Sequence, residues 1–205
     1  MKWLKMASAL AGLSPALAVA ASMQVVAFAD KPFCEKVVEL LGDRFVFESS
    51  LSRTIEWEAI ELKGEGPTAR RCSSLDKAII DLDNDGHKDL VVKATFCMKG
   101  GPSDSLYIFP AGSSVLEDAS WQDLGPLLAT QDKFERTGGV YPLTSLHPEE
   151  GQRPPDLITT FSVMPFLLNG RTYVGLTDGR KEWMVIAKYR GSERFDDLCY
   201  LQAAN

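Results

Sequence analysis

The segment DLDNDGHKDLVV, residues 81–92, joins an acidic cluster to the start of an apolar run. Aspartates occupy alternate positions, a glycine follows them, and one more aspartate precedes the apolar residues. Carboxylates held this close repel one another unless a cation compensates their charge. Glycine permits the sharp bend that would turn these side chains inward, so the segment predicts a cation-binding loop between two strands. The acidic positions are Asp81, Asp83, Asp85 and Asp89.

Calcium is the cation that this pattern favours, because it takes six to eight oxygen ligands and a tight loop can supply most of them. We expect three side-chain ligands, one backbone carbonyl and one closing carboxylate. Asp81, Asp83 and Asp85 would supply the side-chain ligands, and His87 would supply the backbone carbonyl. The closing carboxylate would be that of Asp89. The alternative is a metal-free turn rich in Asn, Asp and Gly, but turn chemistry alone needs only one or two such residues. We expect the ion to hold the fold together and to take no part in chemistry.

The spacing Asp-x-Asp-x-Asp-Gly-x-x-Asp over residues 81–89 resembles the calcium loop of the EF-hand class. An EF-hand requires a glutamate at the twelfth position and a helix after it. This chain has Val92 there, inside DLVVKATF, which has the composition of a strand. The context is similar to the calcium-binding β-hairpins of FG-GAP repeats, as in integrin α-subunit propellers and bacterial VCBS-type proteins. The resemblance covers about residues 78–94, and it implies a hairpin with a structural calcium ion.

The rest of the chain predicts a mainly β domain with one short helix near its N-terminus. DKPFCEKVVELLGDR, residues 30–44, has Asp30 as a cap, Pro32 in the first turn and Gly42 as a stop. Short runs of β-branched and aromatic residues follow, including 53–62, and turn residues separate them. We expect antiparallel hairpins or a meander in one propeller-like or sandwich-like domain. A complete propeller is not expected, because the acidic loop occurs once and the chain is too short for seven blades.

The first residues have the features of a secretory signal peptide. Lys2 and Lys5 precede a long apolar stretch, and Ala27-Phe28-Ala29 fits the small-x-small pattern of a cleavage site. We therefore assign 1–29 to the signal peptide and 30–205 to a single periplasmic or secreted domain, with no stable membrane span after cleavage. A retained membrane anchor is the alternative, which Ser14, Pro15 and Gln24 disfavour because they interrupt the apolar run.

The cysteine count agrees with export. An even number of cysteines behind a signal peptide predicts disulfides. Cys72 and Cys97 flank the acidic loop at similar distances, so a hairpin would place them opposite each other. This pairing would leave Cys34 and Cys199 to connect the two ends of the domain. A zinc site is the competing interpretation, but the chain has no close pair of cysteines and only two histidines.

The charge balance limits the class of partner. Without Lys2 and Lys5, 20 basic residues stand against 28 acidic ones, a net charge of −8. A chain this acidic, without a basic cluster, is not expected to bind nucleic acid through phosphate contacts. A metal ion or a basic partner is expected instead.

No complete catalytic motif accompanies these features. Glu56, Glu58 and Glu61 could suggest paired carboxylates for sugar hydrolysis, but alternation along a strand would place Glu56 and Glu58 on one solvated face. We expect the domain to recognise a protein, a peptide or an envelope glycan. One specific form of this function is that of an inhibitor or immunity protein that blocks a wall-degrading enzyme. A secreted hydrolase with carboxylate chemistry is the alternative, and a calcium-dependent assembly factor of the envelope is a third.

Overall fold

A computed structural model describes residues 23–42, 50–64, 74–98, 101–114, 116–120, 132–135, 139–143, 145–160, 162–177, 182–191 and 194–204. Within these ranges the protein is mainly β, with one α-helix and one short 3-10 helix, η1 (Ser50–Arg53). The predicted fold class is confirmed: neighbouring strands pair antiparallel in two open sheets and one two-stranded ribbon. No described helix is long and apolar enough to cross a membrane.

The larger sheet has six strands and contains both the first and the last described strand of the chain. Its order is β10-β11-β12-β13-β1-β8. The strands are β10 (Ser162–Leu168), β11 (Arg171–Thr177), β12 (Trp183–Tyr189), β13 (Phe195–Ala203), β1 (Met23–Phe28) and β8 (His147–Pro148). Burial alternates along much of the edge strand β10, whereas β11 and β12 are almost continuously buried, as expected for strands covered on both faces.

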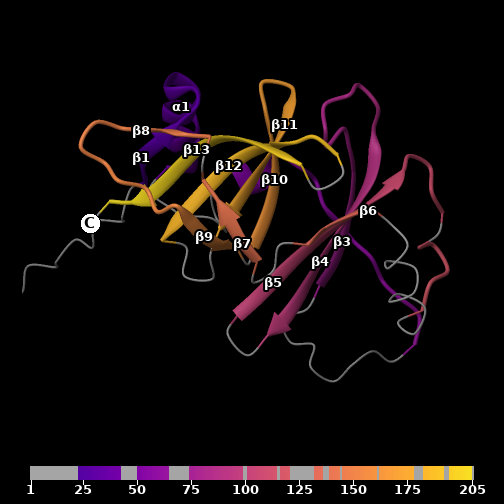
Figure 1. Cartoon of the computed structure of the whole chain (residues 1–205). Helices are drawn as coiled ribbons and strands as arrows, with labels where there is room; N and C mark the ends of the chain where they lie inside the picture. Colours follow the sequence, from indigo (N-terminus) through magenta and orange to yellow (C-terminus); the bar gives the residue numbers. More distant parts are fainter. Residues whose placement is uncertain are drawn as a thin grey trace, which may run out of the picture.

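The second sheet carries the acidic loop. Its order is β2-β3-β4-β5-β6. The strands are β2 (Glu58–Ala59), β3 (Ser74–Ile80), β4 (Asp89–Met98), β5 (Gly101–Pro110) and β6 (Asp132–Glu135). The strands β7 (Gly139–Pro142) and β9 (Leu157–Thr160) form the separate ribbon. Figure 1 shows β3 to β6 on one side of the molecule and the six-stranded sheet on the other.

The expected N-terminal helix is confirmed as α1 (Lys31–Leu41). The Asp30 carboxylate accepts a hydrogen bond from the Phe33 N–H at 3.2 Å, which caps the helix start. Gly42 ends the helix with a positive φ of 60°, and its N–H donates to the carbonyl of Val38. Figure 1 shows α1 beside β1 on the outside of the six-stranded sheet.

Three groups of buried apolar side chains hold these layers together. The largest joins the two sheets and includes Val26, Leu82 and Val185. A second lies between α1 and the six-stranded sheet and includes Phe166. The third packs the residues after β5 against the far face of β4 and includes Phe109. Each layer therefore buries an apolar face that it could not shield alone.

Strand β1 lies inside the segment 1–29 that the sequence assigned to a signal peptide. It is an inner strand, paired with β13 on one side and β8 on the other. Val26 and Ala27 are at most 1% exposed. The described part of the sheet therefore includes residues 23–28, which precede the boundary at residue 30 that the sequence predicted.

The predicted disulfide between Cys34 and Cys199 is present, with 5.7 Å between the Cα atoms. Both residues are fully buried, and the bond joins α1 to β13. The predicted partner pair lies outside the described part of the chain, because Cys72 and the side chain of Cys97 are not described. The expected strand over 53–62 is wrong in length: only Glu58 and Ala59 pair, with Lys77 and Asp76 of β3.

Candidate metal centre and neighbouring pocket

The acidic loop connects two hydrogen-bonded strands, as the sequence predicted. Ile80 at the end of β3 pairs with Asp89 at the start of β4, so residues 81–88 form the hairpin loop. The segment after the loop is a strand and not the helix that an EF-hand requires. Leu82, within the loop, is only 1% exposed and belongs to the core between the sheets. Its burial anchors the loop to the fold.

Two residues of the loop adopt left-handed backbone conformations. Asn84 has a φ of 64° and Gly86 a φ of 93°. Glycine has no Cβ to clash at such angles, and asparagine tolerates them better than most residues. The bend predicted at Gly86 is therefore confirmed, and a second bend lies at Asn84.

The carboxylates of the loop accept hydrogen bonds from its own backbone. Asp81 accepts from the N–H groups of Asp85 and Gly86, both at 3.0 Å. Asp83 accepts from the Asp85 N–H at 3.2 Å, and Asp85 accepts from the His87 N–H at 2.7 Å. These bonds turn the carboxylates inward and fix the bends between them.

The three alternating aspartates converge. One carboxylate oxygen from each of Asp81, Asp83 and Asp85 lies within 4.8 Å of the others. Such a group could hold a metal ion, because hard cations prefer carboxylate oxygens. Asp81 and Asp83 are half-buried, and Asp85 is exposed.

The other two predicted ligands are placed differently. Asp89 lies outside this converging group, and burial raises its pKa, an effect to which the charges of Asp83, Asp85 and Asp81 add. The His87 side chain is 87% exposed, with its Nδ1 at 3.3 Å from an Asp85 oxygen. The roles of the His87 carbonyl and of Asp89 as ligands stay predictions.

Asn84 ties the loop to the opposite sheet. Its side-chain amide donates to the carbonyl of Thr172 at 3.0 Å and accepts from the Thr172 N–H at 2.8 Å. The side chain thus pairs with β11 as a neighbouring strand would. Asn84 also lines a hollow of ≈ 210 Å³ together with three cationic side chains, those of Arg171, Lys188 and Arg190. The acidic loop therefore faces a basic part of the six-stranded sheet.

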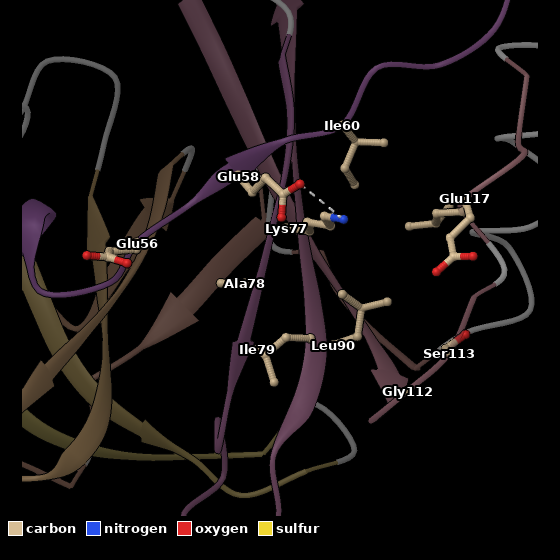
Figure 2. Close-up of a pocket in the computed structure, with 11 residues that line it drawn as sticks. Glu56, Glu58, Ile60, Lys77, Ala78, Ile79, Leu90, Gly112, Ser113 and Glu117 are labelled. Carbon is tan, nitrogen blue, oxygen red and sulfur yellow. Dashed lines mark ion pairs between the residues drawn. The ribbon is translucent and has the colours of Figure 1, made fainter.

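A larger hollow, ≈ 430 Å³, lies over β3 and β4 beside the segment that follows β5 (Figure 2). Ile79, Leu90 and Leu116 contribute apolar surface to it. Ile79 is 52% exposed, so a large apolar side chain of β3 is open to solvent at this hollow. The side chain of Glu117 points toward the hollow from the opposite wall in Figure 2. We call this hollow the β3–β4 pocket.

Two of the three glutamates considered for hydrolysis line the β3–β4 pocket: Glu56 and Glu58, but not Glu61. Glu58 forms an ion pair with Lys77 at 3.4 Å. Figure 2 shows Glu56 on the far side of that pair from Glu117. Glycosidases need two carboxyl groups that flank one bond. In this pocket the Glu58 carboxylate is engaged in its ion pair with Lys77, and the hydrolase alternative stays a prediction.

The sequence alone did not point to Asn84, Ile79 or Glu117. The signal for Ile79 was available, because in β3 it alternates with the buried Ala78 and Ile80, which places it on the outer face. Comparisons of the chain with protein-family models, with curated proteins and with solved structures gave no match. The resemblance to FG-GAP hairpins therefore stays a prediction that rests on residues 78–94.

Proposed function

We propose that this protein is a calcium-stabilised recognition domain of the periplasm or the extracellular space, which binds a basic, partly apolar protein or peptide surface of the cell envelope. The observation that carries the proposal is the β3–β4 pocket, which the half-exposed Ile79 lines together with three glutamates. Exposed apolar surface rimmed by polar residues is typical of interaction sites.

The chemistry of the loop supports calcium as the metal. The converging ligands are all carboxylates, without histidine or cysteine side chains, and this donor set suits calcium, magnesium or manganese better than zinc. The loop geometry is that of a strand–loop–strand hairpin, in keeping with the FG-GAP resemblance. Calcium tolerates irregular coordination, whereas magnesium demands an octahedron. The loop would thus keep β3 and β4, which form the floor of the pocket, in a fixed arrangement.

The charge of the pocket supports a cationic partner. Glu56, Glu58 and Glu117 line it, and Lys77 is the one basic residue among its described lining residues. The overall excess of acidic residues adds a long-range attraction for basic proteins, which speeds their association. A basic wall-degrading enzyme is a partner of this chemistry, and in that case the domain would act as its inhibitor.

Isothermal titration tests the proposal with two probes: an amphipathic lysine–leucine peptide and lysozyme, a basic wall-degrading enzyme. We expect binding of at least one probe, no binding of a glutamate–leucine peptide of equal length, and at least tenfold weaker binding to Ile79→Ser. Leu157→Ser is the matched control, because Leu157 is 58% exposed on β9 and does not line the pocket. Failure of both probes to bind, or equal weakening by the two variants, would refute a basic partner at this pocket.

A further inference from the structure

We propose that the signal peptide is cleaved after Ala20 and not after Ala29, so that the exported protein keeps β1. This inference rests on the proposed export, and it names the processing site. Several segments near the N-terminus satisfy the small-x-small rule, and two of them after the apolar stretch are Ala18-Val19-Ala20 and Ala27-Phe28-Ala29. The structure bears on the second of these, because Ala27 and Phe28 belong to β1 and the Ala29 N–H is bonded to β13.

Strand β1 is held on both edges. Its residues Met23, Gln24 and Val25 pair in register with Ala203, Gln202 and Leu201 of β13. On the other edge, Ala27 and Phe28 pair with Pro148 and His147 of β8. Beyond the strand, the Ala29 N–H donates to the carbonyl of Leu198 at 2.8 Å. Cleavage after Ala29 would remove all of these bonds and would leave β13 without its neighbour on that edge.

The side chains of β1 also complete two parts of the core. Val26 and Ala27 belong to the core between the sheets, and Met23 belongs to the core beneath α1. Both cores contain residues of β13, such as Tyr200 and Leu201, which are at most 2% exposed. Loss of residues 23–28 would expose these side chains to water. A domain that began at Asp30 would therefore lack an inner strand and part of its core.

The earlier site makes an ordinary signal peptide. Lys2 and Lys5 provide the basic start, and the apolar stretch from Met6 to Leu17 has a suitable length. Four of the next five residues are small, and the cut after Ala20 leaves Ala21 and Ser22 ahead of β1. Residues 23–28, MQVVAF, are then apolar because they form a buried strand. In the sequence alone they look like a continuation of the signal peptide.

The first experiment determines the N-terminus of the exported protein. The full chain is produced in a bacterium, and intact mass and N-terminal sequencing are applied to the periplasmic fraction. We expect the chain to begin at Ala21. A start at Val19, Ser22 or Met23 would overturn the cut after Ala20 but would support the retention of β1. A start anywhere from Gln24 to Asp30 overturns the processing site while leaving export intact. A chain that stays in the cytoplasm with residues 1–20 attached overturns export and the processing site together.

A pair of variants in the full chain gives a second, independent readout. Val26→Ala removes a buried side chain of β1, whereas Gln24→Ala changes an exposed one in the same strand. If β1 stays in the mature protein, the melting temperature of exported Val26→Ala should fall by several degrees and that of Gln24→Ala should not. Cleavage after Ala29 would make both mature proteins identical to the wild type, so equal melting temperatures would overturn the inference.

Discussion

The side chain of Asp85 is 55% exposed, so its replacement changes the charge of the loop without opening a cavity. We expect millimolar calcium to raise the melting temperature of the metal-stripped protein by about 3–6 °C. This estimate follows from binding at roughly ten times Kd, worth about 1.4 kcal/mol, in a domain of this size. The rise should be absent in Asp85→Ala, because calcium would lose one of its three converging carboxylates.

Asp156→Ala is the matched control for Asp85→Ala, since Asp156 is an exposed aspartate outside the loop. Its calcium-dependent rise should equal that of the wild type. Differential scanning fluorimetry in EDTA and in calcium suffices for the comparison. An equal rise in Asp85→Ala would show that calcium acts elsewhere, and a larger rise with magnesium than with calcium would reassign the metal.

Asn84 combines a left-handed backbone with two hydrogen bonds to Thr172, and two variants separate these contributions. Asn84→Gly removes the amide but suits the positive φ, so we expect a loss of about 1–2 kcal/mol in the free energy of unfolding. Asn84→Ala removes the amide and also strains the backbone, which adds about 1 kcal/mol. Urea denaturation measures both. Unchanged stability in Asn84→Gly would mean that the link to β11 contributes nothing.

The loop also shows how far single residues can be interpreted from sequence. The alternation of Asp81, Asp83 and Asp85 predicts their convergence, because neighbouring positions decide it. The role of Asn84 could not be predicted, since Thr172 lies 88 residues away along the chain. Local spacing predicts a local site, whereas a contact across the fold depends on how the two sheets meet.

At the scale of strands, Asp104 connects β5 to β10. The residue is 9% exposed, and its carboxylate accepts from the Thr95 hydroxyl at 2.7 Å and from the Val163 N–H at 3.0 Å. Asp104→Ala would leave the buried Val163 N–H without this acceptor, so we expect a loss of about 2–4 kcal/mol in the free energy of unfolding. Asp104→Asn keeps one acceptor oxygen and should cost about half as much.

The control for Asp104 is another strand aspartate with a local partner. Asp76 of β3 accepts from the Ser74 hydroxyl at the exposed end of the strand. Asp76→Ala should change the free energy of unfolding by no more than about 0.5 kcal/mol. Urea midpoints that fall equally for Asp76→Ala and Asp104→Ala would contradict a special role of the β5–β10 contact.

The sequence predicted helices and strands correctly where the local signals agree with the contacts that the fold makes. The helix over 31–41 has its own cap and stop, and the β3–β4 hairpin is closed by its loop. The alternating pattern over 53–62 predicted a strand, but only its middle finds a partner in β3. A strand is stabilised by pairing with neighbouring strands, so an alternating pattern without a pairing partner does not form one. For the same reason MQVVAF, residues 23–28, could not be separated from the signal peptide by composition.

At the scale of the whole molecule, the two sheets and the helix are connected by a few contacts that lie far apart in sequence. Asn84 and Asp104 connect the sheets through hydrogen bonds to Thr172 and Val163. The bond between Cys34 and Cys199 joins residues 165 positions apart. The sequence predicted this last connection indirectly: an exported chain favours disulfides, and pairing Cys72 with Cys97 across the acidic loop leaves Cys34 and Cys199.

The disulfide should therefore stabilise the protein mainly by restricting the unfolded chain. A cross-link that closes so long a loop is expected to contribute about 3–5 kcal/mol. We expect Cys34→Ala/Cys199→Ala to lower the urea midpoint accordingly. In the absence of urea, the circular dichroism spectrum of the variant should still be that of the folded wild type. The calcium-dependent rise should persist in this variant, because the acidic loop lies in the other sheet. Loss of the calcium response together with the disulfide would show that the two connections depend on each other.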